Sequence, residues 1–150
     1  MYIVFAQSED ATLPAGVLAR NAEAHFEAIA TLADTEPAAG DGAHRLELTF
    51  DDPPLRAGFV VRIRKTEPSD VAVALLAEQR GDAAGMGALA SRCASVWLVE
   101  PDGLAPEWAI WECCALLALT AFGPILPPDH STLLGVRSAR LRATRLRHAR

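Results

Sequence analysis

Glu112, Cys113 and Cys114 are three adjacent residues whose side chains could do chemistry, and they lie inside the apolar run 108–126. Asp129 and His130 follow that run. A cysteine becomes a nucleophile when a nearby histidine takes its proton and an acid orients the histidine, so these residues could form a small catalytic pocket. A reactive thiolate needs a partly exposed, electropositive setting, however, and the neighbours of both cysteines are apolar. We therefore expect buried thiols, and a small enzyme with a Cys/His/acid pocket is the alternative.

Glu112 has three interpretations, because a carboxylate in an apolar helix is costly unless it is paired, hydrogen-bonded or neutralised. The favoured interpretation is a buried pair with Arg92 or with an indole N–H. The second is a pocket in which the carboxylate binds a cationic group or acts as an acid. The third is an exposed flank beside Trp108 and Trp111 that serves as a surface for a partner.

The sequence motifs predict no catalytic residue, no metal site and no cofactor site. The glycines of 81–87 are not followed by the Lys and Ser/Thr of a phosphate-binding loop, and the residues before them are poor strand formers. The three cysteines include no C-x-x-C pair, and the four histidines (25, 44, 130 and 148) are scattered. Distant ligands could still converge in the fold.

Charge divides the chain into an acidic body and a basic end. Residues 1–136 hold all 19 acidic residues and 8 of the 14 basic ones, a net charge of −11, whereas 137–150 holds six arginines and no acid. The tail could fray, dock on the protein's own acidic surface, or bind another acidic protein. Nucleic-acid binding is disfavoured because the acidic body would repel a polyanion. The tail has no apolar stripe for a membrane. Four of its arginines are candidate interaction residues, together with Glu112, Trp108 and Trp111: Arg140, Arg142, Arg145 and Arg147.

The first half of the chain predicts strand 2–6, helix 14–33, a loop over 35–43, and a hairpin. The hairpin strands 45–50 and 59–64 alternate with period two. Pairing residue 50 with residue 59 across a 51–58 loop sets Leu48 against Val61 and Glu47 against Arg62. The face that carries the charged residues should then be wet.

The second half predicts a helical region over 69–92, which could be two helices hinged at Gly81-Asp82, then strand 95–99, helix 106–123 and an extended segment over 124–134. The fold class is therefore α+β, an antiparallel-rich sheet with helices packed on it. The first six elements match the β-α-β-β-α-β order of the ferredoxin-like motif, followed by an extra helix and the extended segment. We expect one domain over 1–136 and an Arg-rich tail over 137–150.

The functional prediction is a non-catalytic protein-binding module of a bacterial, cytoplasmic type, such as an immunity, inhibitor or chaperone-like protein. The start of the chain lacks the basic region of a signal peptide, and the odd cysteine count fits a reducing compartment. The partner would be another protein or a second copy in a homodimer. The expected contact surface is the acidic body together with exposed aromatic residues near Trp108.

Overall fold

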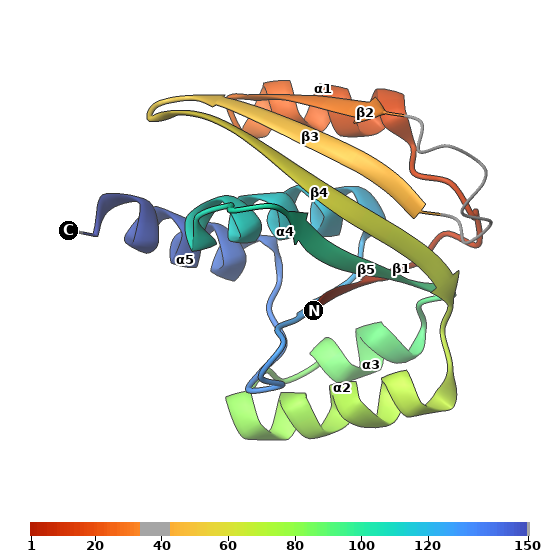
Figure 1. The fold of residues 1–150 in the computed structure, drawn as a ribbon. Helices are drawn as coiled ribbons and strands as arrows, with labels where there is room; N and C mark the ends of the chain where they lie inside the picture. Colours follow the sequence, from red (N-terminus) through yellow and green to blue (C-terminus); the bar gives the residue numbers. More distant parts are fainter. Residues whose placement is uncertain (34–42, 150) are drawn as a thin grey trace.

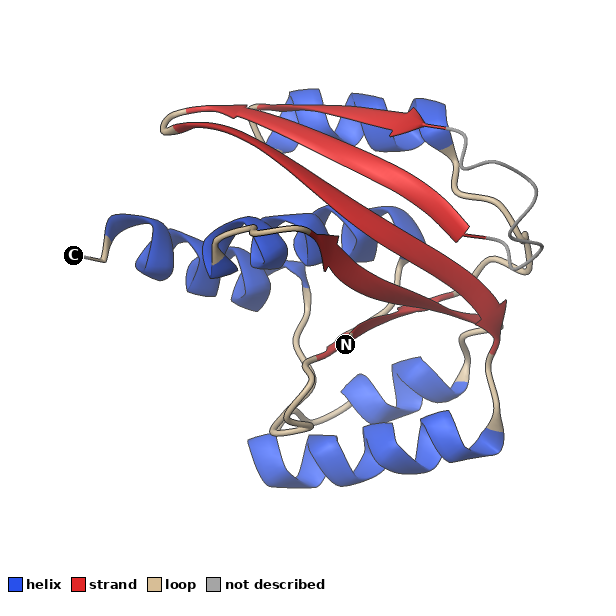
Figure 2. Ribbon diagram, viewed as in Figure 1, coloured by secondary structure: helices blue, strands red, loops and turns tan. Residues whose placement is uncertain are grey.

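An antiparallel sheet of six strands forms the centre of the computed structural model, which describes residues 1–33 and 43–149 (Figures 1 and 2). The strand order is β2-β3-β4-β5-β1-β6, and every neighbouring pair is antiparallel. The strands are β1 (Tyr2–Ala6), β2 (Ala28–Ala33), β3 (Ala43–Asp51), β4 (Pro54–Lys65), β5 (Ser95–Asp102) and β6 (Ile125–Leu126). The α+β class and the antiparallel sheet expected from the sequence are confirmed.

Helices cover both faces of this sheet. They are α1 (Ala15–His25), α2 (Pro68–Gly81), α3 (Met86–Ser91), α4 (Glu107–Ala121) and α5 (Val136–His148). Val4 and Trp97 belong to the larger core with α1, α4 and α5, whereas Phe5 and Val96 belong to a smaller core with α2 and α3. Because successive side chains of a strand point to opposite faces, β1 and β5 are buried on both sides. Figure 1 shows the paired helices α2 and α3 set apart from α4 and α5.

The helix predicted over 14–33 is wrong in its second half. It ends at His25, Glu27 takes a left-handed φ of 50°, and β2 begins at Ala28. The β-branched residues Ile29 and Thr31 suit an edge strand, and burial alternates along it. Three strands therefore follow one another along the chain, and the ferredoxin-like order is not confirmed.

The β3–β4 hairpin forms, but its predicted register is wrong. Asp51 pairs with Pro54 across a two-residue turn, so Phe50 faces Leu55 and Leu48 faces Ala57. The sequence pointed to a long loop because Pro53-Pro54 is typical of loops, whereas a proline can begin a strand. The register differs from the expected one by an even number of residues, so each side chain keeps its predicted face.

The charged face of the hairpin is partly exposed, as expected, but its ion pairs differ from the prediction. Glu47 lies opposite Gly58, and its carboxylate accepts a hydrogen bond from Arg56 Nε at 2.7 Å. Arg62 pairs with Glu100 of β5 at 3.6 Å. The neighbouring strand β5 therefore supplies an acid for Arg62, whereas Glu47 pairs with Arg56 within the hairpin.

The predicted elements after β4 are found with altered bounds. The region 69–92 is two helices, because Asp82, the residue after α2, takes a left-handed conformation and α3 begins at Met86. In the segment 124–134, β6 forms a bridge between Ile125 and Leu134. Of the 15 residues of α4, 13 are buried, as the all-round apolar pattern predicts. Within the described residues, no helix has the length and hydrophobicity to cross a membrane.

Candidate binding site between α4 and α5

Helix α5 packs against α4 through small side chains. Ala139 and Ala143 have no exposed surface, and their size lets the two helix backbones approach closely. Residues 137–148 of the expected tail therefore belong to a helix, α5, that is docked on the protein's own body. The contact is with the largely apolar helix α4, and Glu112 of that helix lies beside Arg140.

Guanidinium–aromatic contacts hold both flanks of α5. Arg140 lies 4.4 Å from the centre of the Phe26 ring, and Arg142 lies 5.1 Å from the Trp111 ring. Arg147 lies 4.4 Å from the Trp108 ring. A guanidinium over an aromatic face is attracted by about 0.5–2 kcal/mol, depending on solvent exposure. Three of the four candidate arginines therefore turn toward the body, and Arg145 points to solvent.

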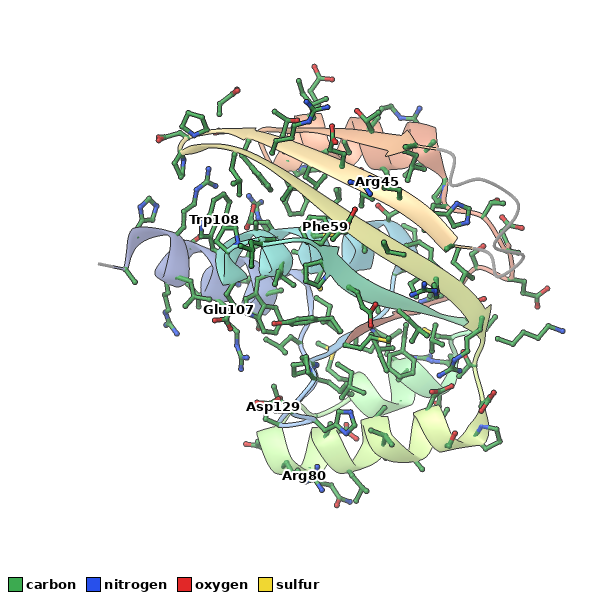
Figure 3. The ribbon with its side chains drawn as sticks, in the orientation of Figure 1. Arg45, Phe59, Arg80, Glu107, Trp108 and Asp129 are labelled. Carbon is green, nitrogen blue, oxygen red and sulfur yellow. The ribbon has the colours of Figure 1, made fainter. Side chains whose placement is uncertain are left out.

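The expectation of exposed aromatic residues near Trp108 is wrong. Trp108 is 8% exposed and Trp111 is 3% exposed, and both belong to the larger core. Trp108 also makes an edge-to-face contact with Phe50 of β3, with ring centres 5.0 Å apart. Figure 3 locates Trp108 and Glu107 at the beginning of α4. The indole N–H of Trp111 donates a hydrogen bond to Glu107 at 3.4 Å.

Glu112 is buried, with 5% of its surface exposed, and its electrostatic partner is Arg140 rather than the suggested Arg92, which is exposed. The Glu112 carboxylate lies 3.9 Å from Arg140 Nε, a distance too long for a hydrogen bond. It accepts no hydrogen bond within the part of the chain that the structure describes. Burial raises the pKa of Glu112, and the attraction of Arg140 and Arg147 opposes this rise only in part.

A polar pocket of about 280 Å³ opens beside Glu112. Four segments build it: the end of α1, the β3–β4 turn, α4 and α5. On the α5 side, Arg147 Nε is buried and has no hydrogen-bond partner. The lining residues are His25, Phe26, Glu27, Asp52, Glu112, Arg140, Thr144, Arg147 and His148. We call this cavity the Glu112 pocket.

The walls of the Glu112 pocket carry charges of both signs. Glu112, Glu27 and Asp52 supply carboxylates, and Arg140 and Arg147 supply guanidinium groups. The pocket can therefore offer a ligand both a hydrogen-bond acceptor and a donor. Three of the seven candidate residues meet here, whereas His25 and Asp52 were missed, because no local pattern connects residues that only the fold brings together.

In the second region with candidate chemistry, the thiols lie within α4, and Asp129 and His130 lie in the loop after β6. Cys113 and Cys114 have no exposed surface, and burial raises the pKa of both thiols, which disfavours the nucleophilic thiolate. His130 lies in a loop, where its carbonyl accepts a hydrogen bond from Arg80, and the Asp129 carboxylate accepts one from the Ser131 N–H. Figure 3 places Asp129 and Arg80 close to the C-terminal end of α2.

The solvent-facing side of α5 carries a shallow apolar groove of about 600 Å³. It is lined by Val136, Arg137, Arg140, Leu141 and Thr144, and Leu141 is 50% exposed. We call it the α5 groove. Arg142 and Arg145 line a different hollow, of about 520 Å³, between α5 and the loop after α2. Arg137 and Leu141 were not among the predicted interaction residues, because the helical wheel showed no stripe that would single them out.

No group of His, Cys, Asp or Glu side chains in residues 1–33 and 43–149 is placed to hold a metal ion. Comparison with protein-family models, with curated proteins and with solved structures finds no match for this chain. Function must therefore be argued from the two surfaces of α5.

Proposed function

We propose that this protein is a non-catalytic protein-binding module and that an acidic partner docks on the α5 groove. The observation that carries the proposal is Leu141, half exposed between the arginines of a helix that holds no acidic residue. Arginine is enriched among the residues that supply binding energy in interfaces, and the buried centre of an interface is more apolar than its rim.

The charge distribution supports an acidic partner. Residues 1–136 carry a net charge of −11, so most of the chain repels an acidic protein. The basic helix would attract the same partner, and opposite charges steer an encounter toward one orientation. The working setting we propose is the cytoplasm, since the three cysteines are free and buried. An immunity, inhibitor or chaperone-like role, of a bacterial type, belongs to this proposal.

The two other functions have less support. A nucleic acid could meet the same basic helix, but residues 1–136 carry a net charge of −11 that would repel its phosphates. An enzyme with a Cys/His/acid pocket would need an accessible thiol, and Cys113 and Cys114 are fully buried.

The test captures proteins from a native lysate, identifies a retained partner, and measures its binding to purified variants by calorimetry. Leu141→Gln should weaken binding about fivefold, because half a leucine side chain is worth about 1 kcal/mol of burial. Leu76→Gln on α2 is the matched control, since Leu76 is 51% exposed and lies outside the groove. Arg137→Gln should weaken binding most at low salt, since salt screens exposed charges.

A partner that binds Leu141→Gln as tightly as the wild type contradicts the proposal. Light scattering shows whether the acidic partner is a second copy of this chain or a different protein. If the wild type is a dimer and Leu141→Gln is a monomer, the partner is the acidic surface of a second copy. If both are monomers, the captured protein is the partner.

A further inference from the structure

Two side chains that line the Glu112 pocket, one on α4 and one on α5, have a polar group without a hydrogen-bond partner among the described residues. Glu112, an acceptor on α4, has only the 3.9 Å approach of Arg140 Nε. Arg147 Nε, a donor on α5, has none among the described residues. Most buried polar groups in folded proteins are satisfied, and each exception calls for an explanation. A bound molecule that donates to the Glu112 carboxylate and accepts from the Arg147 guanidinium would give both side chains a partner.

We propose that the Glu112 pocket binds a small zwitterion that carries one ammonium and one carboxylate group, as a free α-amino acid does. The ligand ammonium would lie at the Glu112 carboxylate, and the ligand carboxylate would accept hydrogen bonds from Arg147 and from Arg140.

The charges of the pocket select against simpler ions. An anion that enters meets the carboxylates of Glu112, Glu27 and Asp52, and a cation meets the guanidinium groups of Arg140 and Arg147. A like charge within about 4–6 Å disfavours a charged group, whereas an opposite charge favours it. A zwitterion can place each of its charges against the opposite charge.

The pocket also has a size that suits a small amino acid, and its guanidinium donors are preorganised. Its 280 Å³ holds roughly nine water molecules at about 30 Å³ each, which suits a small amino acid better than a drug-sized ligand. The Phe26 and Trp108 rings hold the guanidinium groups of Arg140 and Arg147 before a ligand arrives. Preorganised groups lose less conformational freedom on binding.

The Glu112 pocket and the α5 groove share Arg140 and Thr144, so the two proposals are separated through residues that line only one of them. Glu112 and Arg147 line the pocket and not the groove, whereas Leu141 lines the groove and not the pocket. Glu112→Gln should therefore affect zwitterion binding alone, and Leu141→Gln should affect partner binding alone, so that either proposal can fail without the other.

The experiment titrates the ¹⁵N-labelled full chain with glycine and with L-alanine at neutral pH and follows the amide and arginine Nε–H signals by NMR. We expect saturable shifts at millimolar ligand, centred on the Nε–H of Arg147 and on the amides around Glu112. Acetate, methylammonium and acetamide are the controls, because each offers only part of the zwitterion's chemistry. Each of them should bind at least about tenfold more weakly, since charge-assisted hydrogen bonds are the strong ones.

Two variants test the assignment of the residues. Glu112→Gln keeps the side-chain volume and removes the charge, and it should weaken amino-acid binding at least about tenfold. Arg147→Lys keeps the charge, loses the fixed planar fork, and should also weaken binding. Glu100→Gln is the control, since Glu100 is paired with Arg62 away from the pocket. The proposal is overturned if neither amino acid gives a saturable shift, if acetate or acetamide binds as tightly as glycine, or if Glu112→Gln binds like the wild type.

Discussion

Replacing Glu112 by glutamine should make the protein more stable at neutral pH. Glu112 is 5% exposed, and its carboxylate accepts no hydrogen bond among the described residues and lies 3.9 Å from its salt-bridge partner Arg140. Glutamine has nearly the same shape and carries no charge that must be removed from water. Arg140, which loses its partner, keeps much of its hydration because 42% of its side chain is exposed.

The size of the gain follows from these contacts. A buried polar group without a partner costs about 1–3 kcal/mol. The attraction of Arg140 and Arg147 offsets part of this cost, and the amide that replaces the carboxylate must itself be buried. We therefore expect a gain of about 1 kcal/mol, which corresponds to a rise of about 2–4 °C in Tm for a chain of this size.

The pH dependence gives this prediction a distinctive signature. Burial holds the pKa of Glu112 above its ordinary value of 4.5, so the folded protein binds this proton more tightly than the unfolded chain does. At a pH above the raised pKa, the buried charge lowers the free energy of unfolding of the wild type. This loss disappears as the pH falls through the raised pKa toward 4.5. The advantage of Glu112→Gln over the wild type should shrink over the same range.

Urea denaturation followed by tryptophan fluorescence, at neutral pH and at several lower values, measures the difference. Arg140→Gln is the informative companion, because it leaves the buried carboxylate without its opposite charge and should destabilise the protein at neutral pH. A Glu112→Gln protein that is less stable than the wild type at neutral pH, with a difference that does not vary with pH, would refute the reasoning.

Three further predictions concern the rest of the fold. Asp70→Asn should lower the free energy of unfolding by about 1–3 kcal/mol in urea at neutral pH, because the carboxylate, 8% exposed, accepts two hydrogen bonds from Arg64 at 2.7 Å each. The hydrogen bonds from Arg64 hold the pKa of Asp70 below its ordinary value of 3.8, so this stability should be lost as the pH falls through the lowered value. Gly123→Ala should cost about 4 kcal/mol or more by thermal denaturation, since a Cβ would collide with the Phe5 carbonyl. Cys113 and Cys114 should resist Ellman's reagent until denaturant is added, because burial raises the pKa of both thiols.

Matched variants control these measurements. Asp102→Asn also removes the acid of an arginine pair, but that pair is exposed and should be worth at most about 1 kcal/mol. At Gly16 a new methyl group would meet the end of the Arg20 side chain at 3.6 Å, an ordinary van der Waals contact, so Gly16→Ala should stabilise α1 by about 0.5–1 kcal/mol. A fast reaction of Ellman's reagent with Cys113 or Cys114 in the native protein would contradict the argument from burial. Equal losses of unfolding free energy in Asp70→Asn and Asp102→Asn would contradict it as well.

The local sequence pattern was sufficient to predict the structure where the burial of side chains decides which face of an element is apolar. The alternation in 45–50 and 59–64 predicted which side chains of the hairpin are buried, and Leu46, Leu48, Phe59 and Val61 are in the core. The apolar run of α4 predicted burial on several sides. Gly81-Asp82 predicted a break between two helices, because a left-handed residue ends a helix.

Local pattern failed where two structures satisfy the same periodicity. Ala28–Ala33 can continue a helix or pair as an edge strand, and its pairing with β3 decided for the strand. The hairpin register was also undetermined, because an even shift leaves every side chain on the same face. Only the length of the turn between Asp51 and Pro54 fixed it.

The sequence by itself determined that Glu112 would be a costly charge in an apolar helix and that the chain would end in a basic segment. Only the tertiary structure decided that Arg140 approaches this carboxylate and that Arg147 lies over Trp108 with its Nε unpaired. The reason is physical: periodicity records which face of an element avoids water, whereas the pairing of two charges depends on how separate elements pack. The pocket of four segments exists because Ala139 and Ala143 let α5 lie close against α4.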